Sequence, residues 1–174
     1  YQRELALGRG VLVGGNDDFV PARIHQGDQS FKAKVRLKGD WADHVAGEKW
    51  SLRVKLAGDD TLFGMKTFSL QHPATRRFVY EWVFHQALAR EDLVPLRYDF
   101  VEVAINGKDL GVYALEEHMD KRLIEYRRRR EGPILKFDES LHWADIVATR
   151  QRGLESATGR RVVVRAAAYC RTRA

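Results

Sequence analysis

The sequence FKAKVRLKGDWADHVAGEKWSLRVKL, residues 31–56, decides how the rest of the chain is organised. Apolar and basic or polar residues alternate in residues 31–38 and again in residues 50–56. A period of two places the two sets on opposite faces of a β-strand. If the two strands pair as an antiparallel ribbon, one face is apolar and the other is cationic. We therefore predict a small sheet with an apolar underside and a basic upper face that carries Arg36, Lys38, Arg53 and Lys55.

The composition is typical of one soluble globular domain. The chain has 174 residues, of which 44% are hydrophobic and 31% are charged, enough for a core and unlike a disordered protein. No apolar run approaches the roughly 18 residues of a membrane helix, so no membrane segment is predicted. The single cysteine, Cys170, cannot form an internal disulfide. Residue 1 is Tyr, so we expect the chain to begin inside a longer protein.

The net charge of +6 is unevenly distributed. Residues 150–174 hold seven arginines and one acid, Glu155. Removing them from the 30 basic and 24 acidic residues of the chain leaves 23 of each in residues 1–149. The body is formally neutral, and a nucleic-acid partner is therefore not favoured. A nucleic-acid binder driven by the arginine-rich end remains an alternative, because such tails bind polyanions.

The order of predicted elements indicates an α+β fold: a small antiparallel sheet with a long helix and a β-hairpin. The longest helix is predicted over residues 75–91, with Thr75 as its N-cap and apolar residues at helical spacing. Asn106-Gly107 between two β-rich runs predicts the hairpin. The remaining expectations are a loose lead-in over 1–18 with a short strand at 11–13, strands at 19–25, 66–71 and 134–137, and helices at 119–130 and through 143–148.

Two charged segments allow two interpretations each. Asp40, Asp43, His44 and Glu48 could together ligate a metal ion, because carboxylates and imidazole are suitable donors. The simpler interpretation is a short helical turn capped by Asp40, and no metal site is predicted. The run 127–130 contains four arginines, which suit either a solvated helix end or a polyanion site. We favour the helix end.

The order of the predicted elements is also that of the smaller lobe of a protein kinase and its hinge. Such a lobe uses a strand lysine to hold nucleotide phosphates and a helix glutamate to orient that lysine. Lys55 on the ribbon and Glu81 on the following helix meet this description. The alternative is a basic strand face turned to solvent, which is common on edge strands. The glycine-rich phosphate loop of an ordinary kinase is absent.

Three collinear blocks closely resemble the spore coat protein H (CotH) kinase family. They are VRLKGDW…GEKWSLRVKL, LFGMKTFSLQHP and RYDFVEVAINGKDLGVYALEEHMDKRLIE. The resemblance covers roughly residues 19–145, and it implies an atypical kinase-like fold that is similar to the N-lobe and hinge of a protein kinase. It also implies ATP and Mg²⁺ as cofactors and transfer of phosphate to Ser or Thr of a protein substrate. On this basis we divide the chain into a lead-in (1–18), a partial CotH kinase-like domain (19–148) and an Arg-rich tail (149–174).

The resemblance implies a set of nucleotide-binding residues. Arg53 and Lys55 would contact phosphates, and Glu116 and Glu117 would lie near the adenine end of the cleft. Replacing Lys55 by Met is expected to abolish nucleotide binding. The full expected set is Arg36, Lys38, Arg53, Lys55, Glu81, Glu116 and Glu117.

The catalytic Asp and the Asp that holds Mg²⁺ are expected downstream of the matching region, and the tail offers only Glu155. We therefore expect the parent protein to be a kinase and this chain to lack both residues. We interpret residues 149–174 as a truncation, a reading-frame change or a disordered tail. A non-catalytic module for coat or surface assembly, or for polyanion binding, is the alternative function. The resemblance is compatible with a bacterial spore coat or cell envelope.

Overall fold

The computed structural model describes residues 1–135 and 140–151. Within them, six strands form one antiparallel sheet in the order β1-β2-β3-β4-β6-β5. Sequential neighbours pair along the sheet except at β5, which folds back outside β6 as the edge strand. The strands are β1 Val20–Gln26, β2 Gln29–Leu37, β3 Leu52–Leu56, β4 Thr67–Gln71, β5 Tyr98–Ile105 and β6 Lys108–Glu117.

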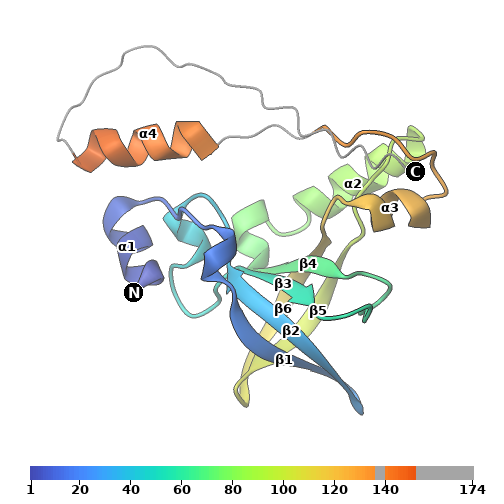
Figure 1. Cartoon of the computed structure of the whole chain (residues 1–174), viewed down its shortest axis with the longest axis horizontal. Helices are drawn as coiled ribbons and strands as arrows, with labels where there is room; N and C mark the ends of the chain where they lie inside the picture. The colour runs from blue at the N-terminus through green and yellow to red at the C-terminus, as the bar shows by residue number, and fades with distance from the viewer. Residues whose placement is uncertain (136–139, 152–174) are drawn as a thin grey trace, which may run out of the picture.

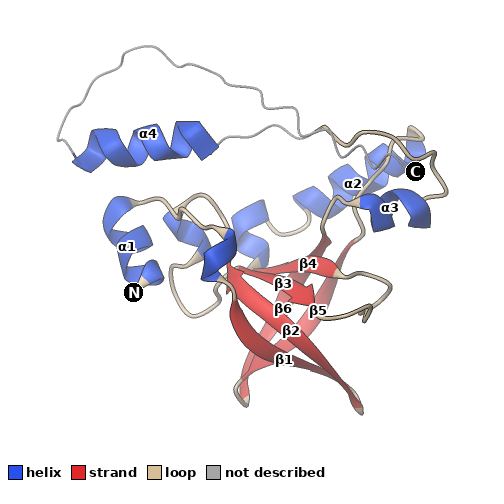
Figure 2. Cartoon of the chain, in the orientation of Figure 1, coloured by secondary structure: helices blue, strands red, loops and turns tan. Residues whose placement is uncertain are grey.

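Helices α1 to α3 lie toward one end of the sheet, and the tips of the β1–β2 and β5–β6 hairpins project from the other end (Figures 1 and 2). This segregation of helices from an antiparallel sheet confirms the α+β class. The helices are α1 Gln2–Arg9, α2 Tyr80–Arg90, α3 Lys121–Tyr126 and α4 Ser140–Gln151, and three 3₁₀ turns are η1 Asn16–Asp18, η2 Ala42–His44 and η3 Pro73–Arg76.

The predicted ribbon is confirmed. Strands β2 and β3 pair with Arg36 opposite Arg53 and Val35 opposite Val54. The side chains that alternate with the basic set are buried on one face, where they join residues from β4 and β6. Trp50 is an exception, because it precedes β3 and is 39% exposed. The buried members of this core are Ala33, Val54, Leu56, Leu62, Met65, Phe68 and Leu115.

The β5–β6 hairpin is also confirmed. Its turn residues Asn106 and Gly107 have φ values of 52° and 79°. Both lie in the left-handed region that a tight hairpin turn requires and that Asn and Gly tolerate. The hairpin brings β6 against β4 and so places the end of β6 near the ribbon.

The long helix predicted over residues 75–91 is wrong in its first part. Residues Pro73–Arg76 form η3, Arg77 and Phe78 follow with positive φ, and α2 begins only at Tyr80. The Thr75 hydroxyl donates to the His72 carbonyl at 2.7 Å, and the His72 ring accepts from the amide of residue 74. These local bonds close a tight turn, which competes with an α-helical first turn.

Helix α2 turns most of its aromatic and aliphatic side chains to solvent. Trp82, Val83 and Phe84 are 39%, 53% and 56% exposed. His85 is the buried residue of this helix, and its ring lies 5.7 Å from the ring of Tyr98 on β5. The helix therefore contacts β5 through His85, while most of its aromatic and aliphatic side chains are exposed.

The remaining differences are at the ends of the chain. Residues 2–9 form α1, where a loose lead-in was predicted, and Ala6 packs with Leu12 and Val45 in a second small core. The predicted strand at 11–13 is reduced to one bridge between Val11 and Trp41. The helix predicted over 119–130 is only α3, which begins after its N-cap Asp120. Residues 136–139 and 152–174, which include half of the predicted strand 134–137 and most of the predicted tail, lie outside the described residues.

Candidate functional site

A row of polar residues crosses four neighbouring strands and continues onto the edge strand. Each member lies opposite the next in the strand register, so all share the face opposite the apolar core. The row places two arginines, a serine, a glutamate and a tyrosine side by side. Its members are Arg36 on β2, Arg53 on β3, Ser69 on β4, Glu116 on β6 and Tyr98 on β5.

A buried ion pair joins Lys38 to Glu116 on this face. The Lys38 Nζ atom lies 2.7 Å from Oε2 of Glu116, and the two side chains are only 12% and 13% exposed. Gln71 links both: its Oε1 accepts from Lys38 at 3.3 Å and its Nε2 donates to Glu116 at 2.5 Å. The backbone amide of Lys38 donates to the Ser51 carbonyl at 2.8 Å and fixes the chain at this point. The lysine is therefore held at both its backbone and its ammonium group.

Further cations surround the pair. Arg53 lies on the same face, attracts the Glu116 carboxylate and is hydrogen-bonded to the His118 ring. Arg76 from η3 adds a positive charge that acts on both members of the pair. Arg36 lies opposite Arg53 and repels it. We call Lys38, Gln71, Arg53, Arg76 and Glu116 the cationic cluster.

The pKa shifts show that this cluster carries an excess of positive charge. Burial raises the pKa of Glu116, but the attraction of Lys38, Arg53 and Arg76 outweighs it and leaves that pKa below its usual value. Burial lowers the pKa of Lys38, and repulsion from Arg53 and Arg76 lowers it further, against the attraction of Glu116. Burial and then repulsion from Arg36 lower the pKa of Arg53. Glu116 faces three cations and Glu81 is paired with one of them, Arg76, so positive charge remains in excess and an added anion would be stabilised here.

Lys55 and Glu81 are not brought together. Lys55 lies on the same strand face as Arg53 but is exposed, between Lys34 and Thr67 on the neighbouring strands. Glu81 lies 3.0 Å from Nε of Arg76. Within residues 1–135 and 140–151 there is no ion pair between Lys55 and Glu81. The lysine that has a buried glutamate partner in this part of the chain is Lys38.

Arg36 lies at the edge of the cluster. Its Nη1 donates to the backbone carbonyl of Leu37 at 3.0 Å, and its guanidinium lies 5.4 Å from the centre of the Phe19 ring. These contacts direct it toward the β1 side of the sheet. It contributes charge to the cluster rather than a hydrogen bond.

Glu117 faces the opposite side of the sheet from Glu116, because successive strand residues alternate. It is 1% exposed and accepts two hydrogen bonds from Arg97, at 2.7 and 2.6 Å. Arg97 also donates to the carbonyls of Phe63 at 2.6 Å and Gly64 at 3.2 Å. This bidentate pair therefore anchors the turn between β3 and β4 and lies outside the cationic cluster.

Gln71 and Arg76 were not identified as site residues from the sequence. Ser69 and Gln71 alternate with Phe68 and Leu70 on β4, and both polar side chains are fully buried. Buried polar residues on one face of a strand are a signal that this face has polar partners. Arg76 had no such signal, because it reaches the cluster only through the unpredicted turn η3.

The loop between β2 and β3 does not gather its four candidate ligands. His44 is buried and its Nδ1 lies 2.8 Å from the Ser51 hydroxyl, whereas Asp40, Asp43 and Glu48 do not join it. The short turn in this loop is η2, which has residue 41 as its N-cap instead of Asp40. No group of three or more His, Cys, Asp or Glu residues suited to a metal occurs in the described parts of the chain.

Residues in the cationic cluster do not fit a Mg²⁺ site. Mg²⁺ prefers six oxygen ligands, of which one or two are protein carboxylates. The cluster offers one carboxylate, Glu116, and that group already accepts from Lys38 and Gln71. The surrounding charges would also repel a cation. The cluster suits an anion.

The described residues thus form an α+β domain that carries the cationic cluster on one face of its sheet. Residues 35–162 match the family described as CotH kinase protein. The match covers more than half of the chain, which therefore belongs to the CotH kinase family, and the resemblance seen in the three sequence blocks is confirmed. A search of curated proteins finds no match. No helix in the described residues is long and apolar enough to cross a membrane.

Proposed function

We propose that the cationic cluster binds the phosphates of ATP. The observation that carries the proposal is the Lys38–Glu116 pair, which is buried, hydrogen-bonded and surrounded by further cations. Kinases hold nucleotide phosphates with a lysine that a glutamate keeps in place. Because the chain belongs to the CotH kinase family, we propose ATP as the anion that binds to the cationic cluster.

In this proposal each residue of the cluster has a distinct part. Lys38 supplies a point charge to a phosphate oxygen, and Glu116 with Gln71 positions it. Arg53 supplies a planar fork that can donate two hydrogen bonds to a phosphate. Glu81 positions Arg76 through their contact at 3.0 Å. The orienting glutamate thus comes from β6 and not from helix α2.

We further propose that the protein to which this chain belongs transfers phosphate from ATP to Ser or Thr of a protein substrate. Such transfer requires Mg²⁺ to neutralise phosphate charge and a base to position the hydroxyl. The cationic cluster supplies neither, because its carboxylate is engaged by Lys38. The chain would therefore bind nucleotide through its described residues, and transfer would depend on acidic residues that are not in the cluster.

Thermal unfolding of the full chain with increasing Mg·ATP tests nucleotide binding. A ligand that binds only the folded state raises stability by RT ln(1 + [L]/Kd), about 2.7 kcal/mol at 100 times Kd. We expect a saturable rise in Tm with ATP, a smaller rise with tripolyphosphate and no rise with adenosine. The absence of a saturable rise with ATP would contradict the proposal.

A polyanion-binding module without kinase activity is the second candidate. The positive excess of the cluster and the engagement of its carboxylate favour it. It predicts that long polyphosphate or a sulfated polysaccharide raises Tm more than ATP does at equal charge. Such a ranking, with no preference for the adenine nucleotide, would replace the ATP proposal by this one.

A further inference from the structure

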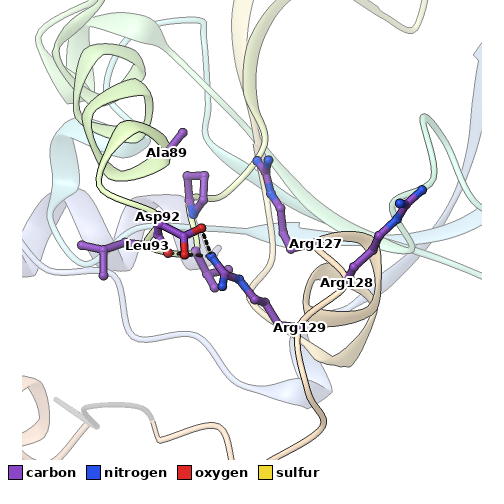
Figure 3. Close-up of a pocket in the computed structure, with 8 residues that line it drawn as sticks. Ala89, Asp92, Leu93, Arg127, Arg128 and Arg129 are labelled. Carbon is purple, nitrogen blue, oxygen red and sulfur yellow. Dashed lines mark hydrogen bonds and ion pairs between the residues drawn. The ribbon is translucent and has the colours of Figure 1, made fainter.

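A cavity of about 380 Å³ lies at the end of α2 that is closer to α3. One wall is the last turn of α2 with the loop that leads to β5, and the other is the turn after α3 (Figure 3). The cavity shares no lining residue with the cationic cluster. Its volume falls in the usual range for ligand pockets, about 300–1,000 Å³.

The cavity has three arginines and one carboxylate in its lining, which are Arg127, Arg128, Arg129 and Asp92. Arg129 donates one hydrogen bond to the carboxylate of Asp92 and another, at 2.6 Å, to the backbone carbonyl of Asp92. Figure 3 shows Arg127 and Arg128 pointing away from that pair. Two positive charges therefore remain after the one carboxylate is matched.

These two arginines lack an anionic partner in the described part of the chain. Neither forms an ion pair there, and the Nε atom of Arg127 is buried without a hydrogen-bond partner. Leaving a buried donor of a charged group unpaired costs free energy. An anion with several acceptor oxygens would satisfy this donor, and the exposed Arg128 side chain, which diverges from Arg127 in Figure 3, would turn toward it on binding.

The rest of the lining is apolar and comes from Ala89, Leu93, Val94 and Pro95. Leu93, which belongs to this apolar lining, is 56% exposed. Exposed apolar surface that adjoins a pocket is typical of a site for another protein segment. A free phosphate ion would use the arginines and leave this surface uncovered.

We propose that this cavity binds a phosphorylated side chain of a peptide, whose apolar neighbours pack on Leu93 and on the other apolar residues of the lining. Arg127 and Arg128 donate to the phosphate, and Arg129 stays on Asp92. The site is independent of nucleotide binding at Lys38, and its test requires no kinase activity.

The test is fluorescence anisotropy of the full chain with a labelled peptide that contains one phosphoserine flanked by leucines, and with its unphosphorylated counterpart. We expect the phosphopeptide to bind at least about 10-fold more tightly, since charge-assisted hydrogen bonds to the phosphate can form only with that peptide. Equal affinity for the two peptides would overturn the proposal. Inorganic phosphate or a single-stranded oligonucleotide that competed as effectively, at equal concentration of phosphate groups, as an unlabelled phosphopeptide would also overturn it.

Variants locate the site. Arg128→Ala is expected to weaken phosphopeptide binding about 10-fold, the loss of one charge-assisted contact, and Arg130→Ala is the matched control, because Arg130 belongs to the same run but does not line the cavity. Equal weakening by both would assign binding to diffuse charge and overturn the site.

Asp92→Asn provides a test that unfolding cannot mimic. Asp92 has a φ of 55°, a conformation that Asn also tolerates. The change removes the only carboxylate of the lining and so the negative charge that neutralises Arg129, while the bond from Arg129 to the backbone carbonyl of residue 92 can remain. We expect tighter phosphopeptide binding, and unchanged or weaker binding would contradict the role given to these arginines.

Discussion

The Lys38 ammonium and the Glu116 carboxylate meet at 2.7 Å, although β3 and β4 separate β6, which carries Glu116, from β2, which ends directly before Lys38. Three steps of about 4.8 Å would place β2 and β6 about 14 Å apart in a flat sheet. Two side chains can close that distance only if the face that carries them is concave. The curl of the sheet therefore concentrates the charges of four strands in one place.

The two partners of this pair should differ in their effect on stability. Glu116→Gln leaves Lys38 and Arg53 without their shared carboxylate, while Arg76 keeps Glu81, and we expect a loss of about 3 kcal/mol, as for other broken buried pairs. Lys38→Met leaves Glu116 with Gln71 and the other cations, and we expect about 1–2 kcal/mol. Urea denaturation at neutral pH measures both values. A larger loss for Lys38→Met would show that the cluster is not dominated by positive charge.

Acid should weaken the wild-type protein more than the Glu116→Gln variant. The pKa of Glu116 is lowered from 4.5 in the folded state, so the unfolded chain takes up this proton first as the pH falls. The stabilisation by Glu116 is present above pH 4.5 and is lost as the pH falls through the folded pKa.

Burial lowers the pKa of His44, His72 and His85, so both proteins lose stability below pH 6.5. The attraction of Glu116 opposes this lowering of the pKa at His85, so the variant also changes the titration of that histidine, and the effect of Glu116 itself is measured below pH 4.5. There we expect the difference in unfolding free energy between the two proteins to shrink as the pH falls. A difference that stays constant down to pH 3 would contradict a lowered pKa.

The Arg97–Glu117 pair should be a structural anchor that depends on the shape of arginine. Arg97→Lys keeps the charge but loses the two-pronged contact with Glu117 and the bonds to the turn at Phe63. We expect a loss of about 2–3 kcal/mol in unfolding free energy. Lys108→Ala, which breaks the exposed pair with Glu48, is the control and should cause no measurable change. Equal effects of the two substitutions would refute the anchoring role.

The apolar residues of α2 should contribute little to folding of this chain. Val83 is 53% exposed, so Val83→Gln is expected to change the unfolding free energy by less than about 0.5 kcal/mol. Leu56→Ala, in the core of the sheet, should cost about 2–5 kcal/mol. Chemical denaturation of both variants measures the contrast. A loss above 2 kcal/mol for Val83→Gln would show that this face is covered in solution.

The ribbon and the hairpin could be predicted from sequence because their signals are local. Alternation in residues 31–38 and 50–56 fixes which side chains share a face, and Asn106-Gly107 fixes the turn. The start of α2 could not be predicted by helical periodicity, because bonds between Thr75 and His72 favour a different turn.

The pairing of Lys38 with Glu116 lay beyond sequence reasoning for another reason. It depends on the order of four strands, on their register and on the curl of the sheet, and none of these is set by residues near Lys38. Alternation along the ribbon predicts Lys38 and Arg53 as site residues, but the sequence pairs Glu81 with Lys55 and provides no partner for Lys38. A local pattern gives the face of a strand, whereas the partner across a sheet is a tertiary property.

Calorimetric titration of Mg·ATP into the full chain tests the central claim most directly, with Lys38→Met and Lys55→Met compared at equal concentration. Both lysines alternate with apolar residues and lie on the same face of the ribbon. Lys38 is largely buried and paired with the Glu116 carboxylate, whereas Lys55 is exposed. We predict saturable binding by the wild type and by Lys55→Met, and affinity at least about 10-fold lower for Lys38→Met, the loss of one contact to a charged group. Undiminished affinity in Lys38→Met, with the variant folded, would contradict the account.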